Sequence, residues 1–290
     1  MATPREIRRR IRSVRNTAQI TRAMEMVSAA KMRRAQERVR ASRPYSERLR
    51  VMMAGLSHVQ GQIDTSAFPL LEQRPENSVG VILITADRGL AGAFNSNVIR
   101  RTTRFLRERD VPAQMVTLGR KGRDFFARTS QGVTAEFTAL GDAPPLDDLR
   151  PVIDIAVDEF VSGRVDAVYL VYTRFVNTLL QVPEVMKLLP IEPPTQDDVA
   201  QQTTQEFIFE PDPAAVLEAI LPRYIQVQLY QALLESVASE HSARMVAMRN
   251  ATDSARDFVD ELTLTLNKVR QAQITREVSE IAAGASALGS

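Results

Sequence analysis

The stretch LESVASEHSARMVAMRNATDSARDFVDELTLTLNKV, residues 234–269, decides the fold of this 290-residue chain. Its apolar and small side chains return in steps of three and four residues, a pattern that falls on Leu234, Val237, His241, Met245, Met248, Thr252, Ala255, Val259, Leu262, Leu266 and Val269. A heptad seam held over about five repeats predicts a coiled coil rather than an isolated helix. The stretch therefore requires a second helix to pack against it.

The helix that carries this seam extends well beyond it. The motif EPDP at residues 210–213 predicts its start, with Asp212 as the N-cap and Pro213 at the first helical position. Pro222 is the one interruption, and we expect it to kink or re-start the helix. Such a helix would be about 110 Å long at ~1.5 Å per residue. We assign residues 212–288 to this C-terminal helix.

The beginning of the chain supplies the partner helix. Apolar residues recur three or four apart, as at Ile7, Ile11 and Val14, within a segment dominated by strong helix formers. A helix over residues 5–59 would be about 80 Å long, and no small globule buries such a rod. Two rods at opposite ends of one chain can pair antiparallel. We therefore predict that residues 1–60 form the N-terminal helix of an antiparallel coiled coil.

Residues 78–190 have a different pattern, which is typical of an α/β domain. Val79–Thr85 is a continuous β-branched and apolar run, as expected of a strand buried on both faces. Strand and helix patterns then alternate, which predicts a mostly parallel sheet. The other expected elements are helices Asn97–Arg109, Arg120–Arg128 and Leu146–Ser162, strands Gln114–Leu118, Val133–Phe137 and Val165–Phe175, and a last antiparallel strand, Thr178–Lys187.

Residues 191–211 connect this domain to the C-terminal helix. They contain Pro193 and Pro194 and no Lys or Arg, so we interpret them as an acidic linker. The predicted fold class is therefore α/β. A Rossmann-like, mostly parallel sheet domain is inserted between two long terminal helices that pair as an antiparallel coiled coil.

The composition excludes several classes of protein. The chain has no Cys, which removes disulfides, thiolate metal sites and thiol nucleophiles. Its two His are too few for a histidine-rich metal centre. No apolar run reaches the roughly 18 residues that a membrane span needs. Residues 1–50 hold 15 Lys and Arg against 4 Asp and Glu, a net charge of +11, whereas the remainder carries −9. This asymmetry suggests a specialised basic terminus that faces an acidic partner.

A glycine-containing loop, DRGLAG at residues 87–92, follows the first predicted strand. Helix N-termini attract anions, so a phosphate-binding interpretation arises. However, the glycine spacing is G-x-x-G rather than G-x-G-x-x-G, and no G-K-[ST] motif follows. Asp87 would also repel a phosphate unless Arg88 compensated. We favour a tight strand-to-helix turn that needs glycine over a nucleotide site.

No catalytic constellation emerges from the remaining polar residues. His241 lies on the heptad seam, where a lone histidine is more often a packed filler than a ligand. Neither a Ser/His/Asp set nor a pair of acid–base carboxylates can be assembled. We therefore assign no catalytic, cofactor-binding or metal-binding residue, and expect no cofactor.

The basic N-terminus has several interpretations. It could bind nucleic acid, although residues 1–44 lack the aromatic side chains that stack on bases. It could be a transit peptide, against which Glu6 and Glu25 count, or a solvated face. We favour contact with an acidic protein.

At the other end of the chain, the weakly polar residues Ile281–Ser290 form either a frayed tail or a slim apolar tip that sits in a protein bore.

Several ordered blocks resemble one family. ITRAMEMVSAAKMR at residues 20–33 is similar to the N-terminal signature of the γ subunits of bacterial-type rotary ATP synthases, and RQAQITREVSEIAAGA at 270–285 is similar to their C-terminal signature. The intervening matches are TADRGLAG at 85–92, QVP at 181–183, EPDP at 210–213 and SEHSARMVAM at 239–248. The resemblance covers essentially the whole chain and begins near its first residue, as expected of a bacterial protein without a transit peptide.

The resemblance implies a function without chemistry of its own. In that family the subunit is the central rotor stalk of the proton-translocating ATP synthase, and it transmits rotation between the membrane c-ring and the three catalytic β subunits. The implied partners are the α and β subunits, the ε subunit and the c-ring, with no nucleic acid. The implied location is peripheral, at the cytoplasmic face of the bacterial plasma (inner) membrane. The alternatives are a stand-alone α/β nucleotide-binding enzyme and a basic helical hairpin that binds nucleic acid.

The resemblance also implies contact residues. Those carried over as contacts with the β subunit are Met24, Lys31, Arg33, Arg34, Lys268, Arg270, Gln271, Thr275 and Glu277. Those carried over as contacts with the ε subunit and the c-ring are Phe207, Phe209 and Glu210. The seam itself places Arg270 and Gln271 just past Val269, so at least one of them faces away from the partner helix. It also predicts that Thr263 and Asn267 face outward.

Overall fold

The fold was obtained as a computed structural model, which describes residues 3–59, 68–129, 132–192, 210 and 212–288. Internal contacts divide the chain into two units. One unit is Ala29–Arg244, and the other combines Met1–Ser28 with Met245–Ser290. Within the part of the chain that the structure describes, none of the helices could serve as a membrane span.

Two long helices contribute to both units: α1 spans Pro4–Val59 and α5 spans Pro213–Leu288. At the start of α1, the Thr3 hydroxyl accepts from Glu6 N at 3.3 Å and the Glu6 carboxylate accepts from Thr3 N at 2.9 Å, which is a reciprocal capping box. At the start of α5, Asp212 Oδ1 accepts from Ala215 N at 2.9 Å, so the predicted N-cap is confirmed.

Of the two outcomes expected at Pro222, a kink or a re-start, the re-start is wrong, because α5 continues through the proline. A proline inside a helix costs about 3 kcal/mol, since it removes a backbone hydrogen bond. Here Leu221 and Ile225, close to the proline, are 2% and 0% exposed. Packing of these side chains into the core offsets the lost hydrogen bond.

A five-stranded sheet forms the centre of the unit Ala29–Arg244, with strand order β3-β2-β1-β4-β5. The first four strands in this order are parallel, and β5 is antiparallel to β4. The mostly parallel sheet with an antiparallel last strand is therefore confirmed. The strands are β1 Val79–Ile84, β2 Ala113–Leu118, β3 Val133–Phe137, β4 Ala167–Phe175 and β5 Gln181–Leu189.

Several element boundaries differ from the sequence prediction; the helix predicted over Asn97–Arg109, for example, begins at Phe94. Two of the differences have clear local reasons. β5 begins at Gln181 rather than Thr178, because Asn177 Oδ1 accepts from the backbone N–H groups of Leu179 and Leu180 and so turns the chain. The predicted helix over Leu146–Ser162 is a 3₁₀ turn, η4 Leu146–Leu149, followed by α4 Arg150–Val161. Pro151 lies in the first turn of α4, where its missing N–H costs nothing.

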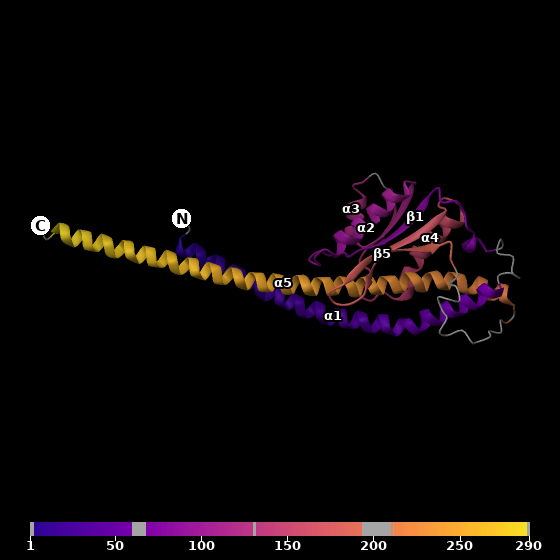
Figure 1. Cartoon of the computed structure of the whole chain (residues 1–290), viewed down its shortest axis with the longest axis horizontal. Helices are drawn as coiled ribbons and strands as arrows, with labels where there is room; N and C mark the ends of the chain where they lie inside the picture. Colours follow the sequence, from indigo (N-terminus) through magenta and orange to yellow (C-terminus); the bar gives the residue numbers. More distant parts are fainter. Residues whose placement is uncertain (1–2, 60–67, 130–131, 193–209, 211, 289–290) are drawn as a thin grey trace. The chain divides into compact units, whose positions relative to one another are not determined.

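Helices cover both faces of the sheet, as Figure 1 shows. α2 (Phe94–Arg109) and α3 (Arg120–Phe126) pack on one face, where Val98, Phe105 and Phe126 join the inward side chains of β1, β2 and β4. α4 and the first part of α5 pack on the other face. All six residues of β1 are buried, as its continuous apolar run predicts.

The unit formed by the two chain ends is held by an apolar cluster between α1 and α5. Ile7 and Ile11 of α1 group with Val259 of α5, and the half-buried side chains packed against them are Val14, Leu262, Leu266 and Val269. Further along, the hydroxyls of Thr21 and Thr252 lie 2.7 Å apart. Every residue of the predicted seam is buried or half-buried, whereas residues 270–283 are all exposed.

Candidate functional site

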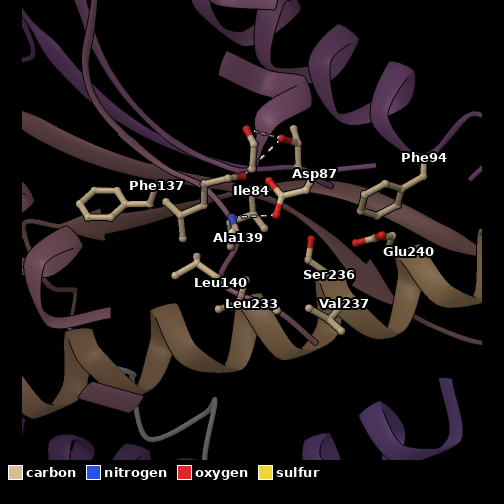
Figure 2. Close-up of a pocket in the computed structure, with 14 residues that line it drawn as sticks. Ile84, Asp87, Phe94, Phe137, Ala139, Leu140, Leu233, Ser236, Val237 and Glu240 are labelled. Atoms are coloured by element: carbon tan, nitrogen blue, oxygen red, sulfur yellow. Dashed lines mark hydrogen bonds between the residues drawn. The ribbon is translucent and has the colours of Figure 1, made fainter. Parts of the chain in front are cut away.

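The loop that follows β1 is built around the Asp87 carboxylate. Its Oδ1 accepts from Arg120 N at 2.9 Å and its Oδ2 accepts from Ala139 N at 2.8 Å. Figure 2 shows the Asp87 side chain pointing toward Ala139, which follows β3. Both carboxylate oxygens therefore hold backbone: one at the start of α3, the other at the end of β3.

Only some of the glycines in and around this loop are required by the backbone conformation or by close packing. Gly92 has φ +54°, in the left-handed region, as the predicted tight turn requires. Gly89 has no such φ, and a Cβ there would meet nothing within 4 Å. The expectation that the turn needs glycine is therefore wrong for Gly89. The closest approach is instead at Gly119, with φ +101°, where a Cβ would lie 2.1 Å from the Thr85 carbonyl oxygen.

A small cavity lies at the carboxyl end of the parallel strands, between β1, β2, β3 and α5 (Figure 2). Its volume is about 50 Å³, enough for a few water molecules but far below the roughly 300–1,000 Å³ of ligand pockets. Its polar groups are already engaged: Ser236 Oγ accepts from Thr173 N at 3.1 Å, and Glu240 pairs with Arg244 at 2.6 Å. The cavity is therefore too small for a nucleotide.

Metal binding finds no support in the described part of the chain, where no group of three or more His, Cys, Asp or Glu side chains is placed to hold an ion. His241 is buried, with 2% of its surface exposed, as expected of a packed seam residue. It is not an apolar filler, however, because its Nε2 lies 2.9 Å from Asp142 Oδ1. The sequence prediction did not foresee this long-range polar partner.

The predicted β-subunit contacts on α1 differ in their surroundings. Arg33 and Arg34 are exposed, and Met24 is half-buried. Lys31 is half-buried, and its Nζ lies 2.7 Å from Asp142 Oδ2 within the same unit. An internal carboxylate therefore already engages the Lys31 charge, whereas Arg33 and Arg34 form no ion pair among the described residues.

On α5 the predicted contacts share one property, which is that all are exposed: Lys268, Arg270, Gln271, Thr275 and Glu277. The predicted outward position of Asn267 is confirmed, but Thr263 is half-buried and its hydroxyl donates to the Val259 carbonyl at 2.7 Å. The expectation for Thr263 is therefore wrong.

Only one residue of the predicted ε and c-ring contact can be placed. Glu210 is exposed, and Phe207 and Phe209 lie outside the described residues.

Exposed apolar side chains on α5 form a surface that the contact prediction did not include. Ile274, Val278 and Ile281 are 54%, 59% and 72% exposed and lie four and three residues apart, on one face of the helix. Their spacing alone could have identified them. An unpartnered apolar face of this kind is typical of a protein–protein contact.

Comparison with known proteins gives consistent matches over the full length. A family model described as ATP synthase matches residues 3–288. The chain is 53% identical to the ATP synthase gamma chain of Chloroflexus aurantiacus, covering 100% of both chains. It is 52% identical to that of Roseiflexus castenholzii, covering 99% of each.

Solved structures share the fold at low sequence identity. A chain in the Euglena gracilis mitochondrial ATP synthase superposes with a TM-score of 0.69 at 18% identity, covering 98% of this chain and 94% of that chain. A chain in the central stalk and c-ring structure of the Tetrahymena thermophila enzyme gives 0.59 at 23% identity, covering 80% and 99%. Together with the family match over residues 3–288, the identity to the bacterial gamma chains assigns the sequence: the chain belongs to the ATP synthase γ-chain family.

Proposed function

We propose that this chain acts as the central rotor stalk of a rotary ATP synthase and transmits rotation between a membrane c-ring and three catalytic β subunits. As a γ chain it is a non-catalytic subunit of the ATP synthase complex. The observation that carries the proposal is the full-length match to γ chains in a protein whose helices of 56 and 76 residues leave outer faces uncovered. A stand-alone enzyme has no use for such rods.

The stalk is an antiparallel coiled coil in this proposal, made of residues 1–60 and 212–288. The contacts between α1 and α5 support the antiparallel direction. Ile7 groups with Val259 and the residues beyond it, whereas Thr21 meets Thr252. Residue numbers therefore rise along one helix as they fall along the other. Residues 78–190 then form the α/β domain, and residues 191–211 the linker.

Contact with the β subunits is assigned to two exposed polar surfaces. Arg33 and Arg34 supply positive charge on α1, and the surface on α5 begins near Lys268 and includes Arg270 and Gln271. A single exposed ion pair contributes only about 0–1 kcal/mol. Torque that depends on rotation angle therefore needs a patch of charge facing acidic side chains of the partner.

The remaining partners follow from the same assignment. The α subunits would complete the ring around the stalk. The ε subunit and the c-ring would contact the segment of Phe207, Phe209 and Glu210. Through the c-ring the chain would lie peripherally at the cytoplasmic face of the bacterial inner membrane, where it takes part in ATP synthesis coupled to hydrogen ion transport.

Reconstitution tests this proposal against its alternatives. The chain should co-purify with α and β subunits, and rotation-coupled ATP hydrolysis by the purified complex should depend on its presence. Tight nucleotide binding by the chain alone would instead favour the α/β enzyme. Salt-sensitive binding of DNA or RNA by the chain alone would favour the nucleic-acid-binding hairpin.

A further inference from the structure

Asp142, in the loop between β3 and α4, contacts both long helices. Its Oδ2 lies 2.7 Å from Lys31 Nζ of α1, and its Oδ1 lies 2.9 Å from His241 Nε2 of α5. Its backbone carbonyl accepts from the Arg38 guanidinium, also of α1, at 3.1 Å. All of these residues belong to the unit Ala29–Arg244. One loop residue thus joins three separate segments of the unit.

The other side of the His241 ring faces a cation. Arg244 Nη1 lies 3.4 Å from His241 Nδ1, and Arg244 Nη2 donates to Glu240 Oε1 at 2.6 Å and to the Gly89 carbonyl at 3.3 Å. A guanidinium can only donate hydrogen bonds, so Nδ1 must carry the lone pair. Nε2 then carries the proton and donates to Asp142. The hydrogen-bond network therefore assigns a neutral imidazole in one tautomer.

We propose that Asp142, His241 and Arg244 form a proton-sensitive clasp. While His241 is neutral, the clasp holds the loop of residues 87–92, here called the Gly89 loop, against α5 through Arg244. When His241 takes up a second proton on Nδ1, Arg244 is displaced and the Gly89 loop is released. The clasp rests on these contacts alone and does not depend on the proposed function.

Burial of the ring is the largest influence on the pKa of His241, and it lowers that pKa because the charged form loses its hydration. The carboxylates of Glu240 and Asp142 favour protonation of His241, and the cation of Arg244 opposes it. Lys31 and Arg38 of α1 contact Asp142 rather than the ring, Lys31 through the carboxylate and Arg38 through the backbone carbonyl.

Asp142 stays ionised through this change. Burial by itself would raise the pKa of Asp142, but the hydrogen bond from Lys31 and the interaction with His241 bring that pKa below its ordinary value. The contact with Asp142 therefore survives when His241 is protonated. The contact that fails is the one between Nδ1 and the guanidinium, since both groups are then cations and neither has a lone pair.

The two histidines of the chain make the titration directly observable by NMR of the imidazole groups in the full-length protein. His58→Gln assigns the two signals and serves as the control. We expect His241 to titrate below the pH of an ordinary histidine. Arg244→Gln should raise its midpoint, and Asp142→Asn should lower it. Opposite shifts would show that both charges act on the ring in the directions the clasp requires.

Release of the loop can be followed with a spin label, because the chain has no other cysteine. Leu90→Cys places the label beside Gly89 at a side chain that is 65% exposed. Mobility of the label should rise as the pH falls from about 8 to about 5, with the same midpoint as the His241 signal. His241→Gln should abolish this rise, and a label at Leu179→Cys, on the β4–β5 turn, should not show it.

Several results would overturn the clasp. These are an ordinary titration midpoint for His241, midpoint shifts of the same sign in the Arg244 and Asp142 variants, or a label at residue 90 whose mobility does not change when His241 is protonated. Circular dichroism checks that each variant folds. If Asp142→Asn does not fold, Arg244→Gln still shows whether loss of the guanidinium raises the titration midpoint of His241. All of these measurements use the isolated chain, so failure to assemble with α and β subunits would contradict the proposed function and leave the clasp standing.

Discussion

The hydroxyl oxygens of Thr21 on α1 and Thr252 on α5 lie 2.7 Å apart, and the two residues are only 9% and 2% exposed. Each hydroxyl also lies within hydrogen-bond distance of a carbonyl of its own helix, Ala18 for Thr21 and Met248 for Thr252. A buried polar pair among mostly apolar or small seam residues favours one register of the two helices, because a shift would leave a hydroxyl facing apolar side chains.

Thr252→Val should destabilise the paired helices by about 0.5–1.5 kcal/mol, the usual net worth of one hydrogen bond. The double variant Thr21→Val with Thr252→Val should lose less than the sum of the two single variants, because no hydroxyl is then left without its partner. Unfolding followed by circular dichroism measures both effects. Thr265→Val, at an exposed position of α5, is the matched control. Additive losses would show that the two hydroxyls act independently.

Asp87→Ala should destabilise the α/β domain by about 1.5–3 kcal/mol, because two backbone N–H groups lose a charged acceptor. Chemical denaturation of the full chain gives the size of the loss. Asp154→Ala, which removes an exposed carboxylate from α4, should change stability by less than about 0.5 kcal/mol. A stable Asp87→Ala protein would mean that the loop needs no such anchor.

Gly119→Ala should be far more damaging than Gly89→Ala. At Gly119 the positive φ and the approach to the Thr85 carbonyl together predict a loss of roughly 2–6 kcal/mol. At Gly89 a methyl group meets nothing within 4 Å, so stability should be almost unchanged. Melting temperatures of the two variants compare them directly, and equal values would contradict the geometry of this turn.

Arg33→Glu combined with Arg34→Glu should weaken coupling more than assembly, because reversed charge repels an acidic partner surface while the buried face of α1 is untouched. Protons pumped per ATP hydrolysed should fall in a complex that still purifies. Arg100→Glu combined with Arg104→Glu makes the same charge change at exposed positions of α2 and should have no such effect. Unchanged pumping in the first variant would identify the basic patch as a solvated face.

Arg270→Ala combined with Gln271→Ala should slow ATP hydrolysis by the assembled complex roughly tenfold, the equivalent of losing one charge-assisted hydrogen bond. Both side chains are exposed, so assembly of α1 with α5 should be unaffected. Thr265→Ala combined with Asn267→Ala provides the control, since both residues are exposed on the same helix. A wild-type rate in a fully assembled complex would remove this contact from the proposal.

The elements that the sequence predicted best are those whose signal is local and repeated. The seam from Leu234 to Val269 follows helical periodicity over its whole length, and its residues are indeed shielded. The continuous apolar run of β1 identified a strand covered on both faces. The N-cap at Asp212 was predictable because its hydrogen bond spans only three residues.

What the sequence could not predict are contacts between distant residues. Asp87 meets Ala139 across 52 positions, and His241 meets Asp142 across 99. No periodicity or local motif connects such pairs, because the sheet topology alone brings them together. The internal partner of Lys31 was missed for the same reason, and Thr263 was misplaced because a helix face near the edge of the seam is neither clearly inward nor outward.

The position of α5 at the carboxyl end of the parallel strands has a consequence for ligand binding. Doubly wound α/β folds bind their ligands in a crevice at this edge, yet here Leu233, Ser236 and Val237 occupy it (Figure 2). These side chains therefore serve the packing of a helix rather than contact with a ligand. A crevice could open at this edge only if this part of the longest helix moved away.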